Sequence, residues 1–525
     1  PMTREQALAA GPRVRIKSPR LDGSFALKGG RFDDVRLADY HASVDKHSPE
    51  IDLLNPSGTA NAYFAELGWV PSGAAPKLPD AGTVWKADGD LLTPEHPVTL
   101  TWDNGEGLVF KRTIALDDNF MFSITQSVEN HGTQPVTLLP YSLISRTGTP
   151  KILGYYILYE GPIGFLGGSL YGNPSFQSER HVGYKDLKEK KHVAADKVDG
   201  WIGITDKYWL AALVPDPKAT VTASFNYANP GGTDKYQVDT LGAALTIAPG
   251  ASGEVNSRLF AGAKEVRLLD RYTDTLGIAR LDLAVDFGWF YFLTKPIFYV
   301  LSTFHSWLGN FGLAILLLTV IIKLIFFPLA NKSYRAMSKM KALQPEMLRL
   351  REAYKDDPTR LNQEIRDLYS REKANPAAGC LPVLVQIPVF FALYKVLFVT
   401  IEMRHAPFYG WIKDLSAPDP LSVFTLFGAI PWDPAQYHLQ FLNIGIWPLI
   451  MGVTMFLQQK LNPPPPDPVQ ARIFLMLPVV FTFLLAQFPA GLVIYWAWNN
   501  ILSITQQWVI MRQTKTTKTT KTAKT

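Results

Sequence analysis

Cysteine is almost absent from this chain of 525 residues, and the single one, Cys380, lies in an apolar run. A disulfide within the chain is therefore impossible, and redox chemistry explains nothing here. No glycine-rich phosphate-binding loop occurs, so we expect no nucleotide to be consumed, and we identify no cofactor, metal site or catalytic residue. Between about Arg13 and Asp282, no apolar run is long enough to cross a membrane.

The first 285 residues consist instead of short stretches in which apolar and polar residues alternate. Glycine, proline, asparagine and aspartate separate these stretches. Alternation with such punctuation is typical of an all-β sandwich or barrel. We therefore expect residues 1–285 to form an all-β sandwich domain. The clearest stretches are residues 98–102, 107–116, 121–128 and 221–227.

A segment rich in aromatic residues, 286–310, joins this region to the rest of the chain. Trp289 and Trp307 stand near its ends, and Lys295 and His305 add scattered charge. Because aromatic rings suit the headgroup layer of a bilayer, we expect an interfacial aromatic amphipathic helix. A buried aromatic core helix remains the alternative.

Five strongly apolar segments follow, and we expect each to be a transmembrane helix of an α-helical bundle. Most approach the roughly 20 residues that cross a hydrocarbon layer of ~30 Å. The fourth is shorter, so it must be tilted less or sit in a locally thinner bilayer. The segments are residues 311–330, 377–402, 441–459, 473–488 and 491–511.

The charge of the connecting loops predicts how these helices are oriented. Residues 331–376 contain eleven lysines and arginines, whereas residues 403–440 contain two. Because basic loops favour the cytoplasm, we expect the first loop inside and the second in the periplasm. The β domain is then periplasmic, and the loop 460–472 and the C-terminus are cytoplasmic. A domain exported in this way requires an upstream span, so we expect that an N-terminal anchor is missing from a sequence that begins at Pro1.

The basic loop 331–376 has the pattern of a cytoplasmic helical hairpin. Apolar residues recur at helical spacing from Met337 to Met347, and the spacing resumes at Leu361 after a break that ends with Pro358. A solvated connection between two spans is the alternative. The final residues, 512–525, alternate threonine with lysine and predict a disordered basic tail. Such a tail can touch ribosomal RNA or anionic lipid, or can merely aid solubility.

Two lysines, Lys323 and Lys395, lie inside apolar segments, and no aspartate or glutamate accompanies them within 311–329 or 377–401. A lysine near the bilayer centre costs about 2.5–3.5 kcal/mol on insertion scales, so each requires a reason. Lys395 has apolar neighbours on its helical face, and we interpret it as snorkelling outward. Lys323 has Thr319 one turn earlier on the same side. Without a carboxylate partner, a hydrated cavity is the best way to keep Lys323 charged.

Polar residues also form a stripe along the last apolar segment, and the second segment adds one amide. At membrane depth such groups must face one another or water. We therefore expect a hydrophilic groove, although hydrogen bonding between packed helices would produce the same spacing. The residues of this candidate lining are Thr319, Lys323, Gln386, Tyr495, Asn499, Ser503 and Gln506.

Four motifs, in order along the chain, resemble the YidC/Oxa/Alb family of membrane insertases. Any one of them alone would be weak, but their order makes the resemblance specific over roughly residues 286–512. The β region fits the large periplasmic domain of Gram-negative members in position and size. The motifs are MKALQP at 340–345, NPAAGCLP at 375–382, QIPVF at 386–390 and FPAGLVIYW at 488–496.

The resemblance implies a function as well as a fold. Family members are insertases and chaperones that place and fold integral proteins in the bacterial inner membrane, alone or with the Sec translocon. Their groove opens to the cytoplasm, and a groove arginine attracts acidic residues of the substrate; Lys323 takes its place here, which puts bidentate pairing in doubt. By the same resemblance, the residues that contact the substrate helix are Thr319, Ile387, Phe390, Tyr495 and Trp496.

The resemblance also implies the partners of the chain. These are nascent membrane proteins, the ribosome, the Sec translocon and membrane lipids, with no small-molecule substrate. A multi-pass protein of the bacterial inner membrane is expected, with a β-supersandwich-like domain in the periplasm.

Two other functions remain open from the residues themselves. A solute transporter would show inverted repeats around a midplane site, which this sequence lacks. An enzyme acting on carbohydrate would need an acid/base pair in the β region. Asp103, Glu106 and His181 are candidates there, but their spacing marks no such pair.

Overall fold

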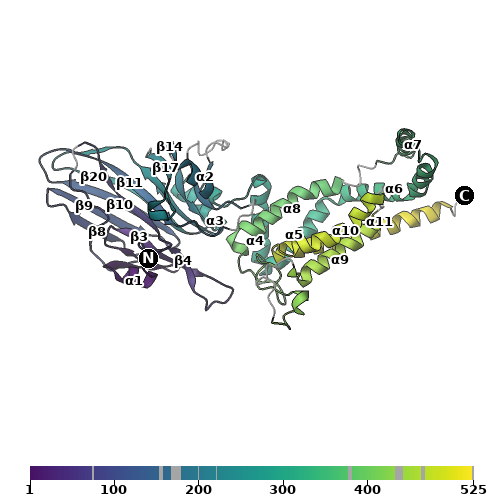
Figure 1. Ribbon diagram of the computed structural model, residues 1–525, viewed down its shortest axis with the longest axis horizontal. Helices are drawn as coiled ribbons and strands as arrows, with labels where there is room; N and C mark the ends of the chain where they lie inside the picture. The colour runs from purple at the N-terminus through teal and green to yellow at the C-terminus, as the bar shows by residue number, and fades with distance from the viewer. Residues whose placement is uncertain are drawn as a thin grey trace. The chain divides into compact units, whose positions relative to one another are not determined.

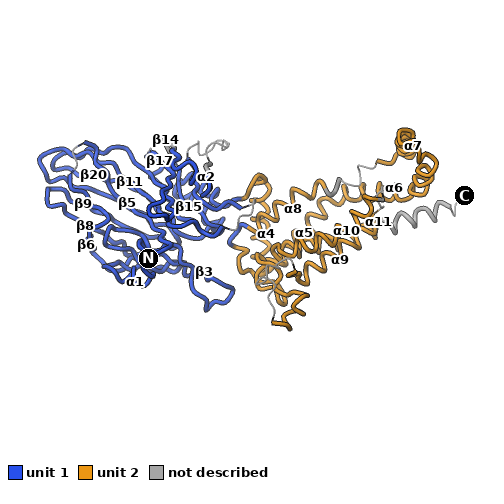
Figure 2. Tube along the Cα trace, in the orientation of Figure 1, with its two compact units in different colours: residues 1–286, 399–401 blue, residues 287–398, 402–525 orange. Residues whose placement is uncertain are grey.

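The chain forms a β-sheet unit followed by a helical unit in the computed structural model (Figure 1). The division falls after Asp286, and residues 399–401 group with the first unit (Figure 2). Residues 1–73, 76–152, 158–166, 179–198, 200–219, 221–375, 381–431, 442–462 and 468–522 are described. Of the segments predicted after the β domain, the parts that lie outside the described residues are 376 of 331–376, 377–380 of 377–402, 432–440 of 403–440, 441 of 441–459, 463–467 of 460–472 and 523–525 of 512–525.

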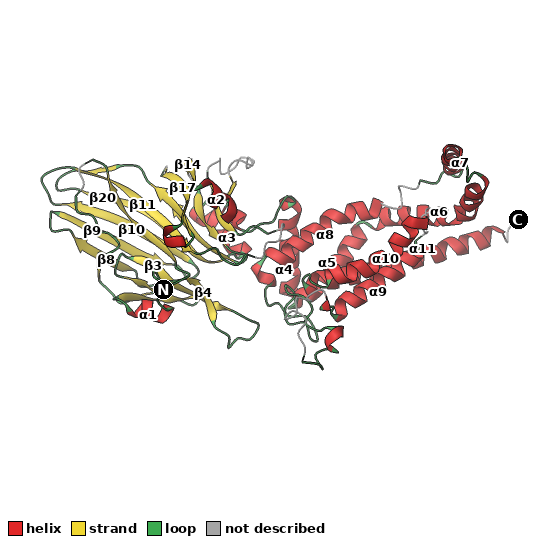
Figure 3. Cartoon of the chain, viewed as in Figure 1, coloured by secondary structure: helices red, strands yellow, loops and turns green. Residues whose placement is uncertain are grey.

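The β unit contains two sheets, and Figure 3 shows that strands dominate it. Among the described residues, the pairing of named strands is antiparallel except between β1 and β7. The larger sheet has the order β14 (His192–Val198), β17 (Val221–Ala228), β18 (Lys235–Leu241), β11 (Val136–Thr147), β5 (Tyr63–Pro71), β3 (Arg31–His41), β2 (Leu21–Ala26), β1 (Arg13–Lys17) and β7 (Leu91–Leu92). Two strands lie off this path: β19 (Leu245–Ile247) pairs with β11, and β4 (Glu50–Leu54) pairs with β3. The other has the order β13 (Glu179–His181), β12 (Gly161–Phe165), β15 (Trp201–Thr205), β16 (Trp209–Pro215), β20 (Ser252–Ala263), β10 (Met121–Asn130), β9 (Leu108–Leu116), β8 (Val98–Asp103) and β6 (Lys86–Ala87).

The core of the β unit lies between these two sheets. Along β9, every second residue is buried, from Leu108 to Leu116. The rings of Phe32 on β3 and Phe122 on β10 meet across the two sheets with centroids 5.3 Å apart. The alternation in the sequence thus correctly predicted a β-rich domain, and β8, β9, β10 and β17 fall on the four stretches that showed it most clearly.

A charged side chain, Arg112, is buried within this core. Its guanidinium donates hydrogen bonds to the backbone oxygens of Gly30 and Leu67 and lies over the ring of Trp85. Burial lowers the pKa of Arg112 to about 10, because the apolar surroundings disfavour the charged form. Gly30 has a φ of +61°, and a Cβ there would lie 2.4 Å from the guanidinium, so only glycine fits this position.

Short helices border the β unit, and long helices make up the second unit. The short ones are α1 (Arg4–Ala9), α2 (Tyr184–Lys190) and α3 (Val266–Leu276). The long ones are α4 (Tyr291–Leu308), α5 (Phe311–Ile325), α6 (Phe327–Ala353), α7 (Pro358–Arg371), α8 (Leu381–Val399), α9 (Ile446–Leu461), α10 (Pro468–Leu485) and α11 (Ala490–Thr522).

Helix α5 begins sharply and ends at a bend. The Asn310 side chain accepts a hydrogen bond from the Leu313 backbone N–H at 3.1 Å, which caps the first turn. At Phe326 the chain bends by 67° and continues as α6. Pro328 lies in the first turn of α6, and because proline has no N–H it cannot continue the hydrogen-bond ladder of α5. The predicted segment 311–330 is therefore not one straight helix.

Three other helices have ends that differ from the predicted segments. α9 begins at Ile446 rather than 441, because buried Asp419 accepts the Trp447 N–H at 2.9 Å and fixes the start. α10 begins at Pro468 rather than 473 and so includes the polar residues Gln470 and Arg472, which hydropathy had excluded. α11 continues as helix to Thr522, where a disordered tail from 512 was expected, because adding residues to an existing helix costs little.

A helix that crosses a membrane must be both long enough and apolar enough. Among the described residues, no single helix meets both requirements by itself. The bent pair α5 and α6 meets them only when the two helices are taken together.

Candidate functional site

The candidate site centres on Lys323, in the last turn of α5. Its ammonium nitrogen donates a hydrogen bond to the Ser503 hydroxyl on α11 at 2.6 Å, and the side chain is half-buried. In the part of the chain that the structure describes, no carboxylate oxygen lies within 4 Å of this nitrogen. The last turn of a helix favours a cation, since its free carbonyl groups carry partial negative charge. The ammonium is therefore held by a neutral hydroxyl and a helix end.

Ser503 is positioned to accept from that ammonium. Its own hydroxyl donates to the Asn499 backbone oxygen one turn earlier, at 2.8 Å. That bond uses the hydroxyl proton and leaves the oxygen lone pairs for Lys323. Tyr334 of α6 also interacts with Ser503, and its ring belongs to a small cluster with Ala330 and Ile510. Three helices thus contribute to the surroundings of Ser503.

The other predicted lining residues are less closely connected. Thr319 is buried, and its hydroxyl bonds to the Ile315 backbone oxygen of its own helix at 2.7 Å. Gln386, Asn499 and Gln506 are half-buried. The Gln506 amide nitrogen is inaccessible and has no hydrogen-bond partner among the described residues. Within the described residues, Lys323 therefore bonds directly to Ser503 but to none of Thr319, Gln386, Asn499 and Gln506.

The predicted contact residues of α8 and α11 come together as an aromatic cluster. The ring of Phe390 on α8 packs edge-on against Trp496 on α11, with centroids 4.8 Å apart, and lies 6.4 Å from Tyr495. Trp496 extends the cluster to Phe481 on α10, at 5.9 Å. Ile387, one turn before Phe390, leaves 41% of its surface exposed. Leu384 and Phe391 are exposed as well, so an open apolar face lies along α8.

Two buried polar residues of α11 were missed by the sequence reasoning. Asn500 donates to the Thr454 hydroxyl on α9 at 3.2 Å. Gln507 donates to the Leu461 backbone oxygen at 3.3 Å and to the Asn462 side chain at 3.2 Å. These residues lie seven apart, hence on one face, and each follows directly after a residue of the predicted stripe. That spacing was the available signal, and it marks a second polar face that joins α11 to α9.

The interpretation of Lys395 as an outward-snorkelling residue stays a prediction. Its side chain is half-buried, and its Cε lies 2.8 Å from where a Cβ on Gly288 would stand. The aliphatic stem therefore packs against the chain just before α4.

Two of the candidate acid/base residues of the β unit, Asp103 and His181, do not form a pair. The Asp103 carboxylate accepts from the Gly105 backbone N–H at 2.8 Å, within the β8–β9 turn. The His181 ring stacks on Tyr159 at 4.1 Å. His181 is on β13 and Asp103 on β8, seven steps apart in the sheet order, which corresponds to roughly 30 Å at ~4.8 Å per step. General acid/base catalysis by both is excluded at that separation.

Comparison with known proteins assigns both units to one family. Residues 13–300 match the family described as YidC periplasmic domain, and residues 303–518 match that described as 60Kd inner membrane protein. The membrane protein insertase YidC of Methylorubrum extorquens (strain PA1) is 56% identical over 514 residues, which cover 98% of this chain and 83% of the relative. That of Bradyrhizobium diazoefficiens is 54% identical over 525 residues, which cover 98% and 84%.

A solved structure of an active YidC insertase covers 95% of both chains at 16% identity. Its TM-score of 0.38 is too low for the likeness to add to the argument. The assignment rests on the sequence identity to these relatives. That identity excludes the two alternatives, a solute transporter and an enzyme acting on carbohydrate. The chain therefore belongs to the YidC family of membrane protein insertases, in the form with a periplasmic domain, and acts as an insertase of the inner membrane rather than as an enzyme.

Proposed function

We propose that insertion proceeds through a hydrophilic groove in which Lys323 is the attracting charge. The observation that carries this proposal is the half-buried ammonium on the Ser503 hydroxyl, with no carboxylate within 4 Å among the described residues. A cation held only by neutral groups offers its charge to an anionic visitor, whereas one in an internal ion pair does not. An acidic flank of an incoming segment is that visitor.

The groove lowers the cost of moving the polar flank of a substrate halfway across the bilayer. Hydration and hydrogen bonds replace the water that a polar segment loses in hydrocarbon. The apolar part of the segment meanwhile slides along the aromatic cluster of α8 and α11 into lipid. The polar lining comprises Thr319, Gln386, Asn499, Ser503 and Gln506, and the substrate-contacting residues are Ile387, Phe390, Tyr495 and Trp496.

The helical unit spans the inner membrane five times in this proposal. The basic loop 331–376 and the C-terminus lie in the cytoplasm, and the β unit and the loop 403–440 lie in the periplasm, because lysine and arginine favour the inner side. The bend between α5 and α6 then lies toward the cytoplasmic side. Lys323, three residues before the bend, is near the inner face and accessible from the cytoplasm.

Nascent membrane proteins are the substrates, delivered by a ribosome or by the Sec translocon. The hairpin of α6 and α7 receives them, with membrane lipids as the destination. Asp357 caps α7 by accepting the Arg360 N–H at 3.0 Å, and Glu346 pairs with Arg371 at 3.0 Å, so the hairpin keeps its shape in water. No cofactor and no small-molecule substrate enters this mechanism.

A charge exchange between protein and substrate tests the steering role. A small substrate with an acidic translocated flank and a matched substrate with a lysine flank are inserted by the native chain, by Lys323→Arg and by Lys323→Glu. We expect Lys323→Arg to retain insertion of the acidic substrate and Lys323→Glu to lose at least about tenfold, since the charge contact is worth on the order of 1.4 kcal/mol or more. The lysine substrate should prefer Lys323→Glu.

Lys395→Gln is the matched control, because it removes the other lysine of the apolar segments. It should leave the ratio between the two substrates unchanged. Equal insertion of the acidic substrate by Lys323→Arg and Lys323→Glu would refute the steering role.

A further inference from the structure

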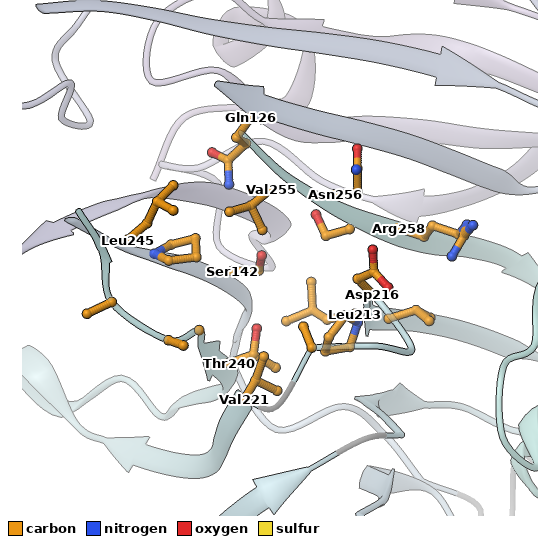
Figure 4. A pocket seen from close by; sticks show the side chains of 18 residues that line it. Gln126, Ser142, Leu213, Asp216, Val221, Thr240, Leu245, Val255, Asn256 and Arg258 are labelled. Atoms are coloured by element: carbon orange, nitrogen blue, oxygen red, sulfur yellow. The ribbon is translucent and has the colours of Figure 1, made fainter. Parts of the chain in front are cut away.

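A cavity of about 240 Å³ lies inside the β unit, between the inner faces of its two sheets (Figure 4). Strands β10, β16 and β20 of one sheet and β11, β17 and β18 of the other contribute to its walls. A cavity of roughly 150 Å³ is already large enough to take up benzene in an engineered protein core. This cavity therefore has room for one medium-sized side chain of a ligand.

Both walls of the cavity present polar side chains that have no hydrogen-bond partner within the described part of the chain. Gln126 is 3% exposed, Thr240 is 6% exposed and Ser142 is 8% exposed, and no side-chain hydrogen bond involves them in the described part of the chain. The Ser257 hydroxyl is inaccessible and likewise unpaired there. The polar atoms of Gln126, Ser142 and Thr240 are accessible from the cavity, so water or a ligand can hydrogen-bond to them there. Polar groups that face one cavity from two sheets therefore indicate a ligand that hydrogen-bonds.

The rest of the wall limits the chemistry of that ligand. Pro140, Leu213 and Val255 give an aliphatic surface, and the described residues that line the cavity include no aromatic ring on which a sugar could stack. Charge among the lining residues is confined to Asp216 and Arg258. The cavity thus suits an uncharged group with both a hydrogen-bonding and an aliphatic part, such as a threonine or glutamine side chain.

The cavity lies where one strand of the sheet stops and its neighbour continues. β16 pairs with β20 from Trp209 to Pro215, and Pro215 is opposite Ser257. β20 extends further, to Ser252, while it stays paired with β10 on its other side. From 252 to 256, β20 therefore has an open side, to which every second residue directs its backbone N–H and C=O. Val255 and Asn256 of this open stretch line the cavity.

We propose that this site binds an extended, uncharged peptide segment as an added strand. The segment continues the place of β16 beyond Pro215, and its backbone pairs with the open side of β20. Successive side chains of a strand point to opposite faces, so alternate residues of the segment enter the cavity. There a neutral polar side chain reaches Gln126, Ser142 and Thr240. This assignment is independent of Lys323 and the groove.

The test uses the full chain in lipid nanodiscs and a fluorescent probe peptide. The probe has seven residues, blocked ends and threonine at alternate positions, and its binding is followed by fluorescence anisotropy. A second peptide of the same sequence carries N-methyl groups on alternate backbone amides. We expect the N-methyl peptide to bind at least about tenfold more weakly, because it cannot complete the strand pairing.

Variants of the chain locate the binding. Gln126→Leu and Thr240→Val remove the hydrogen-bonding groups at similar size, and each should weaken probe binding by about tenfold or more. Thr246→Val is the matched control on the exposed side of β19 and should bind as the native chain does. The probe should also slow amide hydrogen exchange at residues 252–256. Unfolding curves confirm that each variant is folded.

Three results would overturn the proposal. The first is no binding of the probe below millimolar concentration. The second is equal binding by the native chain and Gln126→Leu. The third is displacement of the probe by a free hexose at a concentration where an unrelated peptide has no effect, which would identify a carbohydrate site instead.

Discussion

A methyl group added at Gly452 probes a close contact between α9 and α10. A Cβ at this position would lie 2.0 Å from the Thr482 hydroxyl oxygen and 3.3 Å from its Cβ. That hydroxyl is itself held by a hydrogen bond to the Pro478 backbone oxygen at 2.7 Å. Gly452→Ala therefore cannot be accommodated without moving Thr482 or separating the helices.

The size of the effect follows from two opposing contributions. Overpacking costs about 1–3 kcal/mol, whereas alanine is favoured over glycine in a helix interior by about 1 kcal/mol. Gly452→Ala should therefore destabilise the native chain by up to about 2 kcal/mol. In the background of Thr482→Ala, the obstructing oxygen is gone, and the same change should stabilise by up to about 1 kcal/mol. The sign of the effect reverses between the two backgrounds.

Unfolding of all four chains in the same detergent measures this coupling as a double-mutant cycle. We expect a coupling free energy of about 1–3 kcal/mol between the two positions. Val453→Ala, at the neighbouring exposed position, is the control and should show no coupling to Thr482→Ala. A destabilisation by Gly452→Ala that is the same in both backgrounds would refute the close packing of α9 on α10.

Three further changes test the β unit and the helix ends. Burial lowers the pKa of Lys264 to about 8 from its ordinary value of 10.5, so between these pH values the unfolded chain holds a proton that the folded chain has released. The free energy of unfolding should therefore rise by up to about 3 kcal/mol across this window. pH-dependent unfolding of Lys264→Met should lack that rise. Asp419→Ala leaves the Trp447 N–H uncapped and should accelerate amide exchange at the start of α9; unchanged exchange would contradict the cap. Asn310→Ala removes the cap on Leu313 and should destabilise α5 by about 1 kcal/mol in thermal unfolding, whereas Asn310→Ser should restore most of the loss.

The sequence was most informative where periodicity is local. Alternation located β9 because burial of every second residue is a property of the strand itself. The order of the strands was not predictable, since β14 and β17 pair across a connection that no local pattern encodes. The start of α9 was missed for a similar reason, because it depends on Asp419, which lies 28 residues before Trp447 in the chain.

The polar face of α11 shows the limit of spacing within the candidate site. Ser503 was predicted and does meet Lys323. Asn499 and Asn500 are adjacent, and helical spacing alone allows either to face a neighbouring helix. The structure places Asn500 against Thr454 on α9, which is 46 residues away in the sequence. Spacing could indicate the second polar face, but only the packing of α9 on α11 could identify Thr454 as the partner.

We propose that Lys323 lies in a hydrated pocket open to the cytoplasm, and thiol labelling tests this directly. Cys380 is the only native cysteine, so Cys380→Ser provides a background in which Lys323→Cys and the control Lys395→Cys carry one thiol each. We predict that a charged, membrane-impermeant reagent added from the cytoplasmic side modifies Lys323→Cys rapidly and Lys395→Cys slowly. An arrested acidic substrate should block the reaction at position 323. A thiol at 323 that reacts only with lipid-soluble reagents would contradict the hydrated groove.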